Sequence, residues 1–194
     1  MMIQVLSSLL LLTSVSAFHS IPSLPSSFGR SKTVRHGLLK GIDPILTPEL
    51  LSILRSAGHG DFIAVVDVNY PAVQAAQQTT TGELVRLAGV NMPDTIRAIG
   101  SVMPIDYFVN DPLYHIWPSK GLEMPPLGLE VLKDCQAAIG DTCNGAQFKP
   151  LERYAFYERA KSAFAIVQSS ERRPYGCFLI QKGVVGPDGK DLMP

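Results

Sequence analysis

The sequence predicts an α/β fold, with helices and strands layered in a single domain. Short apolar runs of strand length, such as 62–66 and 178–185, alternate with segments whose apolar residues recur at helical spacing, such as 127–139 and 153–164. The chain has 194 residues, and without its N-terminal leader it is too short for a second substantial domain.

The first predicted helix has a clear beginning and a clear end. Thr47 can cap its N-terminus, Pro48 suits the first turn, and Glu49 complements the positive end of the helix dipole. Leucine and isoleucine residues over 50–54 form an apolar stripe, and Gly58 is expected to stop the helix.

The remaining elements follow from apolar spacing and from turn residues. Three further strands are expected at 83–87, 165–168 and 178–185, and a strand or turn at 106–109. Helices are expected at 94–103, 127–139 and 153–164, the last with Arg153, Tyr157 and Lys161 on a polar face. Turns and loops are expected between them, at 69–71, 77–82, 118–126, 141–150 and 172–176.

The N-terminus has the composition of a two-part leader. Residues 1–17 contain a leucine-rich core that ends in Val15-Ser16-Ala17, which is typical of a signal peptide. Residues 18–38 are rich in serine and basic residues and lack acidic ones, as in organelle transit peptides. With Phe18 at the junction, the leader resembles those of algae with secondary plastids. The alternative is a secreted protein with an N-terminal arm; in both cases the folded domain is expected over 39–194.

Charge and cysteine content exclude several classes of protein. Acidic and basic residues balance at 17 each, and no basic stripe with interleaved aromatics points to nucleic acid. The apolar core of the leader is too short for a permanent membrane anchor, so no membrane association of the mature form is expected. Cys135, Cys143 and Cys177 show no metal-ligand spacing. Buried thiols are expected at 135 and 177, with a Cys135–Cys143 disulfide left open.

The motif Gly58-His59-Gly60-Asp61 is the most distinctive feature of the chain. Glycines on both sides of His59 allow positive φ angles and the close approach of a ligand. Because an imidazole can both give and take a proton near neutral pH, His59 is a candidate general acid/base. A histidine that only hydrogen-bonds within a turn is the alternative reading of this motif.

Seven sequence blocks, taken together and in order, resemble the ribose pyranase and fucose mutarotase family, most closely the animal-type L-fucose mutarotases. The resemblance covers about residues 39–185 and implies a ribose pyranase-like fold, with a mixed central sheet flanked by helices. The blocks are Leu39-Lys40-Gly41, Thr47-Pro48-Glu49-Leu50-Leu51, Gly58-His59-Gly60-Asp61, Asp67-Val68-Asn69-Tyr70-Pro71, Pro104-Ile105-Asp106, Phe156-Tyr157-Glu158-Arg159-Ala160-Lys161 and Tyr175-Gly176.

The resemblance assigns roles to six residues. It makes His59 the catalytic proton donor and implies that the substrate-binding residues are Asp67, Asp106, Tyr157, Tyr175 and Cys177. At the last position family members usually carry Asn, which is a two-sided amide donor and acceptor, whereas a thiol is a weak one. The departure at this position affects the expected sugar affinity or sugar choice rather than the proton chemistry.

The implied activity is mutarotation of L-fucose by general acid/base catalysis, without cofactor or metal. One group protonates the ring oxygen while another accepts the proton of the anomeric hydroxyl, so that the ring opens and closes again on the other face. Two alternatives stay open at this point. One is a D-ribose pyranase that interconverts pyranose and furanose rings, and the other is a non-catalytic monosaccharide-binding protein.

The spacing of His59 and Asp67 raises a geometric question. If 62–66 is a straight strand, the two residues lie roughly 20 Å apart at about 3.3 Å per residue, too far to hold one sugar. Either the strand begins late and the turn folds back, or one site takes residues from two subunits. The ring-like oligomers of the family favour the second reading, and a homo-oligomer with inter-subunit sites is therefore expected.

Overall fold

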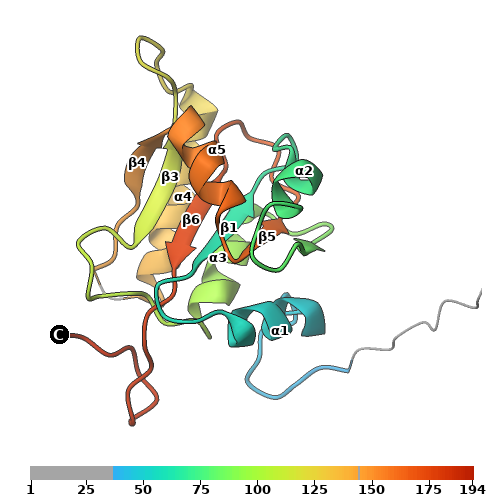
Figure 1. Cartoon of the computed structure of the whole chain (residues 1–194), viewed down its shortest axis with the longest axis vertical. Helices are drawn as coiled ribbons and strands as arrows, with labels where there is room; N and C mark the ends of the chain where they lie inside the picture. The colour runs from blue at the N-terminus through green and yellow to red at the C-terminus, as the bar shows by residue number, and fades with distance from the viewer. Residues whose placement is uncertain (1–36, 144) are drawn as a thin grey trace, which may run out of the picture. The chain divides into compact units, whose positions relative to one another are not determined.

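A mixed six-stranded sheet lies at the centre of the structure and carries helices on both faces (Figure 1). The computed structural model describes residues 37–143 and 145–194. The elements in chain order are α1 (Pro48–Ser56), β1 (Phe62–Val66), α2 (Ala72–Ala76), β2 (Leu84–Arg86), α3 (Met92–Gly100), β3 (Leu113–Trp117), α4 (Pro126–Gly140), β4 (Lys149–Glu152), α5 (Arg153–Lys161), β5 (Ala165–Gln168) and β6 (Phe178–Gln181). The predicted α/β class and flanked mixed sheet are confirmed.

The strand order of the sheet is β2-β5-β1-β6-β3-β4. Strand β6 runs antiparallel to both of its neighbours, β1 and β3, whereas the β1–β5, β2–β5 and β3–β4 pairs are parallel. In the β1–β6 register, Val65 lies opposite Phe178 and Phe62 opposite Gln181. The residues just before β6 therefore lie beside the carboxyl end of β1, and the residues just after β6 lie beside its amino end.

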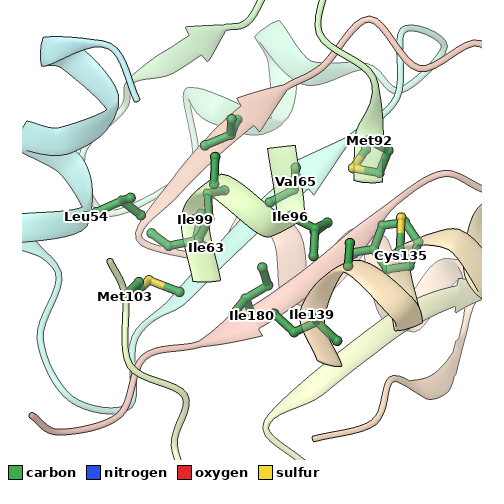
Figure 2. Close-up of a cluster of buried hydrophobic side chains, with 14 of the residues drawn as sticks. Leu54, Ile63, Val65, Met92, Ile96, Ile99, Met103, Cys135, Ile139 and Ile180 are labelled. Atoms are coloured by element: carbon green, nitrogen blue, oxygen red, sulfur yellow. The ribbon is translucent and has the colours of Figure 1, made fainter. Parts of the chain in front are cut away.

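Alternate side chains of β1 enter two separate cores, because successive residues of a strand point to opposite faces. Ile63 and Val65 pack with the helices α1, α3 and α4, and Figure 2 shows these side chains among isoleucines and methionines of that layer. Ala64 and Val66 pack on the other face against the short helix α2 and the helix α5. The sheet is thus covered on both faces. The polar candidate site residues lie at the two ends of β1.

Most of the expected elements are confirmed, with shifted ends. Thr47 caps α1, its Oγ1 accepting from the Leu50 amide at 3.3 Å, but the helix ends at Ser56, before the expected stop at Gly58. The helix expected at 94–103 begins at Met92 because Asn91 caps it, its side chain accepting from the Asp94 amide at 2.9 Å. The last helix and the last strand end earlier than expected, at Lys161 and Gln181.

Three elements were not expected from the sequence. The strand β3 lies in a five-residue apolar and aromatic run between two prolines, where no element was assigned. The strand β4 contains Pro150, which is tolerated because β4 is an edge strand, and it occupies the end of an expected loop. The helix α2 has only five residues after Pro71, too few for a periodic pattern.

The predicted signal peptide (1–17) lies outside the described residues, as does the predicted transit segment (18–38) except for its last two residues. The boundaries of these segments and the start of the domain at residue 39 stay predictions. Within the described part of the chain, no helix has both the length and the apolar character needed to cross a bilayer.

Candidate functional site

His59 and Asp106 form a contact pair beside the amino end of β1. The Nε2 atom of His59 lies 3.1 Å from Oδ2 of Asp106, although 47 positions separate the two residues in the sequence. The histidine side chain is 51% exposed and the Asp106 side chain only 2%. A buried carboxylate therefore holds a ring that is open to solvent, as the orienting partner of a general acid/base does.

Local hydrogen bonds fix the orientation of Asp106. Its Oδ1 accepts from the Phe108 amide at 3.0 Å, and its own amide donates to the Gln181 carbonyl at 3.2 Å. The ring of Phe108 meets the His59 ring edge-on, with centroids 6.0 Å apart. In the tautomer of His59 that donates to the Asp106 carboxylate, Nε2 carries the hydrogen and Nδ1 is the nitrogen available for proton exchange with a ligand.

A second set of polar residues surrounds a pocket at the opposite end of β1. The cavity has a volume of about 160 Å³ and takes its walls from the carboxyl end of β1, from α5 and from the turn before β6. Its lining residues are Asp67, Asn69, Tyr70, Ile116, Arg153, Tyr157, Pro174, Tyr175 and Cys177.

Asp67 is buried at the base of this pocket, and both of its oxygens accept hydrogen bonds. Oδ1 accepts from the amides of Asn69 and Tyr70 at 2.9 and 3.0 Å, and Oδ2 accepts from the Gly176 amide at 3.2 Å. Burial raises the pKa of Asp67 above its usual range, and these hydrogen bonds together with the Cys177 thiol partly oppose that rise. Asp67 is therefore a fixed acceptor that joins the end of β1 to the start of β6.

One thiol and two phenols of the pocket, those of Cys177, Tyr70 and Tyr157, stay protonated near pH 7. Burial raises the pKa of the Cys177 thiol well above its ordinary value, and the neighbouring Asp67 carboxylate raises it further. Burial also raises the pKa of Tyr70 and of Tyr157, whose rings meet edge-on with centroids 5.2 Å apart. Protonated thiol and phenol groups can donate hydrogen bonds to a neutral, hydroxyl-rich ligand.

Tyr175 is presented to the pocket by a braced turn. With φ at +60°, it is the single non-glycine residue with positive φ in the described part of the chain. The preceding residues are held by Glu171, whose carboxylate accepts from Nε and Nη2 of Arg173 at 3.0 and 2.8 Å. Gly176 is required next, because a Cβ there would lie 2.9 Å from Cγ of Glu171.

The six residues predicted as site residues therefore fall into two groups within one chain. His59 and Asp106 lie together beside the amino end of β1, and the other four line the pocket beyond its carboxyl end. All five residues of β1 are paired with β6 or β5, so the strand does not begin late. The reading in which His59 folds back to Asp67 is thereby excluded for a single chain.

The comparisons with known proteins agree with this arrangement of elements. The sequence profile of the RbsD / FucU transport protein family matches residues 40–185. The chain is 36% identical over 155 residues to a fucose mutarotase of Danio rerio, which covers 78% of this chain and 97% of the relative. The chain belongs to the RbsD / FucU family.

Solved structures of RbsD / FucU proteins have the same fold. The crystal structure of the fucose mutarotase in complex with L-fucose from Streptococcus pneumoniae matches with a TM-score of 0.66 and 32% identity, covering 76% of this chain and 100% of that one. A Bacillus subtilis RbsD complexed with D-ribose matches with a TM-score of 0.56 and 19% identity, covering 78% of this chain and 98% of that one. At that identity the second match shows the fold alone.

Three polar pocket residues of this RbsD / FucU chain were not predicted as site residues. Asn69 and Tyr70 belong to the block over residues 67–71, in which only Asp67 was predicted to bind the substrate. Arg153 lies one helical turn before Tyr157, and its Nε is buried without a hydrogen-bond partner in the described structure. The i, i+4 spacing of Arg153 and Tyr157 was the signal that could have placed the arginine in the pocket.

Metal-ligating side chains do not gather anywhere in the described structure. Among residues 37–143 and 145–194, no three His, Cys, Asp or Glu side chains are arranged so that they could hold a metal ion. The three cysteines are all buried free thiols, so the disulfide left open between Cys135 and Cys143 is not formed.

Proposed function

We propose that this RbsD / FucU protein is an aldose mutarotase that interconverts the α and β anomers of L-fucose. The observation that carries the proposal is the exposed ring of His59, held 3.1 Å from the buried carboxylate of Asp106. The 36% identity to a fucose mutarotase over most of the chain supports the choice of reaction and sugar.

The reaction needs only proton transfers at two oxygens of the sugar. Protonated His59 delivers a proton to the ring oxygen, solvent water takes up the proton of the anomeric hydroxyl, and the C1–ring oxygen bond breaks to give the open-chain aldehyde. Rotation about the C1–C2 bond and the reverse transfers close the ring on the other face. His59 exchanges the proton through Nδ1, and Asp106 stabilises the protonated imidazole through Nε2.

The pocket supplies the groups that a neutral sugar needs for orientation. Asp67 is a buried acceptor, while Tyr157 and Tyr175 provide ring faces and hydroxyl groups, and Arg153 provides an unused N–H. A few fixed polar groups against apolar walls are typical of monosaccharide sites. These residues bind and orient the substrate, and the proton chemistry stays with His59.

We propose that a complete site joins the His59–Asp106 pair of one subunit to the pocket of a second copy. Within one chain the pocket of about 160 Å³ is lined by groups that could bind a sugar, but its lining contains no histidine that could act as the acid/base. His59 is also separated from this pocket by the whole length of β1. A closed homo-oligomer would bring the acid/base pair of one subunit to the pocket of another.

Saturation-transfer NMR of the anomeric protons tests the reaction and the sugar. We expect faster exchange between the anomers of L-fucose with the wild-type protein, and no acceleration with His59→Ala. Lys133→Met, an exposed change on α4, serves as the matched control. Acceleration of only the pyranose–furanose exchange of D-ribose would identify a pyranase instead, and no acceleration with either sugar would leave a binding protein.

Mixing two inactive variants tests whether the site is shared between subunits. His59→Ala and Asp67→Asn are damaged in different groups, so after unfolding and joint refolding about a quarter of shared sites would be intact. We expect activity to return to that level. A site contained within one chain would stay inactive in the mixture, because every chain carries one of the two changes.

We also propose that residues 1–38 direct the protein to a plastid by a signal peptide followed by a transit segment. The leucine-rich core and the serine-rich, acid-free composition of these residues support it. Residues 1–45 fused to a fluorescent protein should accumulate in the plastid of an alga with a secondary plastid. Secretion of the fusion would contradict the proposal.

A further inference from the structure

The end of β6 lies against the loop that carries His59. The carbonyl of Lys182 accepts from the Gly60 amide at 2.8 Å, and its amide donates to the Asp61 carbonyl at 2.9 Å. Gln181 adds a third bond, its Nε2 donating to the Gly60 carbonyl at 3.2 Å. The backbone on the C-terminal side of His59 is thus held by two consecutive residues of β6 and its extension.

The side chain of Lys182 holds the other side of the same loop. Its ammonium group donates to the carbonyls of Leu54 and Ala57 at 2.7 and 2.5 Å, which lie at the C-terminal end of α1. A cation at this position satisfies carbonyls that have no helical partner and complements the helix dipole. Ala57 lies two residues before His59 and Gly60 one residue after it, so Lys182 binds the loop on both sides of the histidine.

The next residue, Gly183, holds the segment that carries Asp106. Its amide donates to the Pro104 carbonyl at 2.9 Å. A Cβ at Gly183 would lie 2.1 Å from the Ile105 carbonyl oxygen and 2.8 Å from Cα of Asp106, so only glycine permits this close approach. Two adjacent residues, Lys182 and Gly183, therefore contact the two halves of the acid/base pair.

We propose that Lys182 is a positioning residue for the acid/base pair, clamping the His59 loop in register with the Asp106 segment that Gly183 holds. The expected effect on kcat rests on the proposed function, whereas the expected effect on the position of the His59 ring does not. Lys182 acts through the loop and has no contact with the pocket. Its three donors reach two carbonyls at once, which an uncharged side chain of the same length cannot do.

Kinetics of full-length Lys182→Met and Lys182→Arg test this role. Misplacing a reacting group by about 1 Å can cost up to ~100-fold in rate, and we expect Lys182→Met to lower kcat for L-fucose about 10-fold or more, with KM within about twofold. Lys182→Arg keeps charged donors and should recover a large part of kcat. The exposed Lys133→Met should behave as wild type. A wild-type kcat in folded Lys182→Met would overturn the proposal, as would equal changes in kcat and KM.

The imidazole resonances of His59 give a readout that does not depend on mutarotase activity. In Lys182→Met and in Gly183→Ala we expect the ring ¹H and ¹⁵N signals to shift or broaden toward those of Asp106→Asn, because the contact with Asp106 is lost. Unchanged signals in both variants would exclude the positioning role, even if the wild-type protein proved inactive toward L-fucose.

If the variants do not fold, the wild-type protein still tests whether two carbonyls hold the ammonium group of Lys182. The ¹⁵Nζ of Lys182 should then show restricted motion and slow hydrogen exchange, in contrast to the exposed Lys133, because two carbonyls hold its ammonium group. Motion as free as that of Lys133 would refute the clamp.

Discussion

The thiol of Cys177 lies beside the carboxylate of Asp67, and both side chains are buried in the lining of the pocket. Burial raises the pKa of Cys177 well above its ordinary value, so the thiol is a donor at neutral pH. It stabilises Asp67 but offers a sugar only a weak acceptor, whereas an amide would donate to Asp67 and present its oxygen to the ligand.

Cys177→Asn should therefore tighten sugar binding. One additional hydrogen bond to the ligand contributes about 1 kcal/mol, so we expect the Kd for L-fucose to fall about fivefold, with a smaller effect on the rate at saturation. Titration calorimetry and anomer exchange by NMR measure the two quantities. Cys177→Ser, which keeps a single hydroxyl donor, is the control and should bind close to wild type. Weaker binding by the Asn variant would show that the thiol is adapted to this pocket.

Tyr175→Gly should separate sugar binding from stability. Tyr175 has φ at +60°, which is unfavourable for a bulky side chain by about 1–2 kcal/mol, whereas glycine adopts it freely. We expect the free energy of unfolding to change by less than about 1 kcal/mol, because relief of strain offsets lost packing and greater chain flexibility. The affinity for L-fucose should fall about tenfold or more as the pocket loses a ring and a hydroxyl.

Urea unfolding and calorimetry measure these two effects. Tyr175→Phe is the matched control, since it keeps the ring and the strained backbone and lacks only the hydroxyl. A large loss of stability in Tyr175→Gly with unchanged sugar affinity would mean that the tyrosine has a packing role alone.

Glu171→Gln should weaken the protein in a pH-dependent manner. Burial alone would raise the pKa of Glu171, but hydrogen bonds and the charge of Arg173 outweigh it and lower the pKa to about 2. A carboxyl with a depressed native pKa stabilises the fold above its unfolded pKa, near 4.5, and loses that contribution as pH falls toward 2. At pH 7 the variant should lose about 2 kcal/mol, as expected when a charged hydrogen-bond network is broken.

The difference from wild type should shrink as the pH falls from 5 to 2. Urea unfolding at several pH values measures it, with the exposed Glu130→Gln on α4 as the control. A difference that stayed constant across this range would show that the ionised form of Glu171 does not hold the turn before Tyr175.

All three cysteines should be unreactive in the native protein. Burial raises the pKa of Cys143 to about 11 and raises the pKa of Cys135 and Cys177 as well, so few thiolates are present at pH 7.5. Iodoacetamide should modify none of them within the time that it takes to modify all three in urea, as followed by mass spectrometry. Rapid native modification of any one would contradict the buried, protonated state.

Local sequence signals predicted the elements that have strong caps or clear apolar patterns. Thr47 predicts the start of α1, and the unbroken apolar run of β1 predicts a buried strand. The strand β3 is as long as β1, but His115 interrupts its apolar run and prolines flank it, so it was not predicted. The strand β4 has only four residues and contains Pro150, which its place at the sheet edge makes acceptable. Such elements are decided by their neighbours in the sheet, and local propensity carries little information about them.

Residue chemistry and family resemblance were sufficient to single out His59, Asp67, Asp106, Tyr157, Tyr175 and Cys177. The spacing of His59 and Asp67 already indicated that these two residues lie at opposite ends of a strand. The tertiary structure decided which of the two the other residues join, because the antiparallel register of β6 brings the residues before it to Asp67 and those at its end to the His59 loop. It also revealed Lys182, whose significance depends on carbonyls more than a hundred positions away in the chain. Sequence thus determined which chemical groups this protein has, and the pairing of distant strands determined which of them can act together.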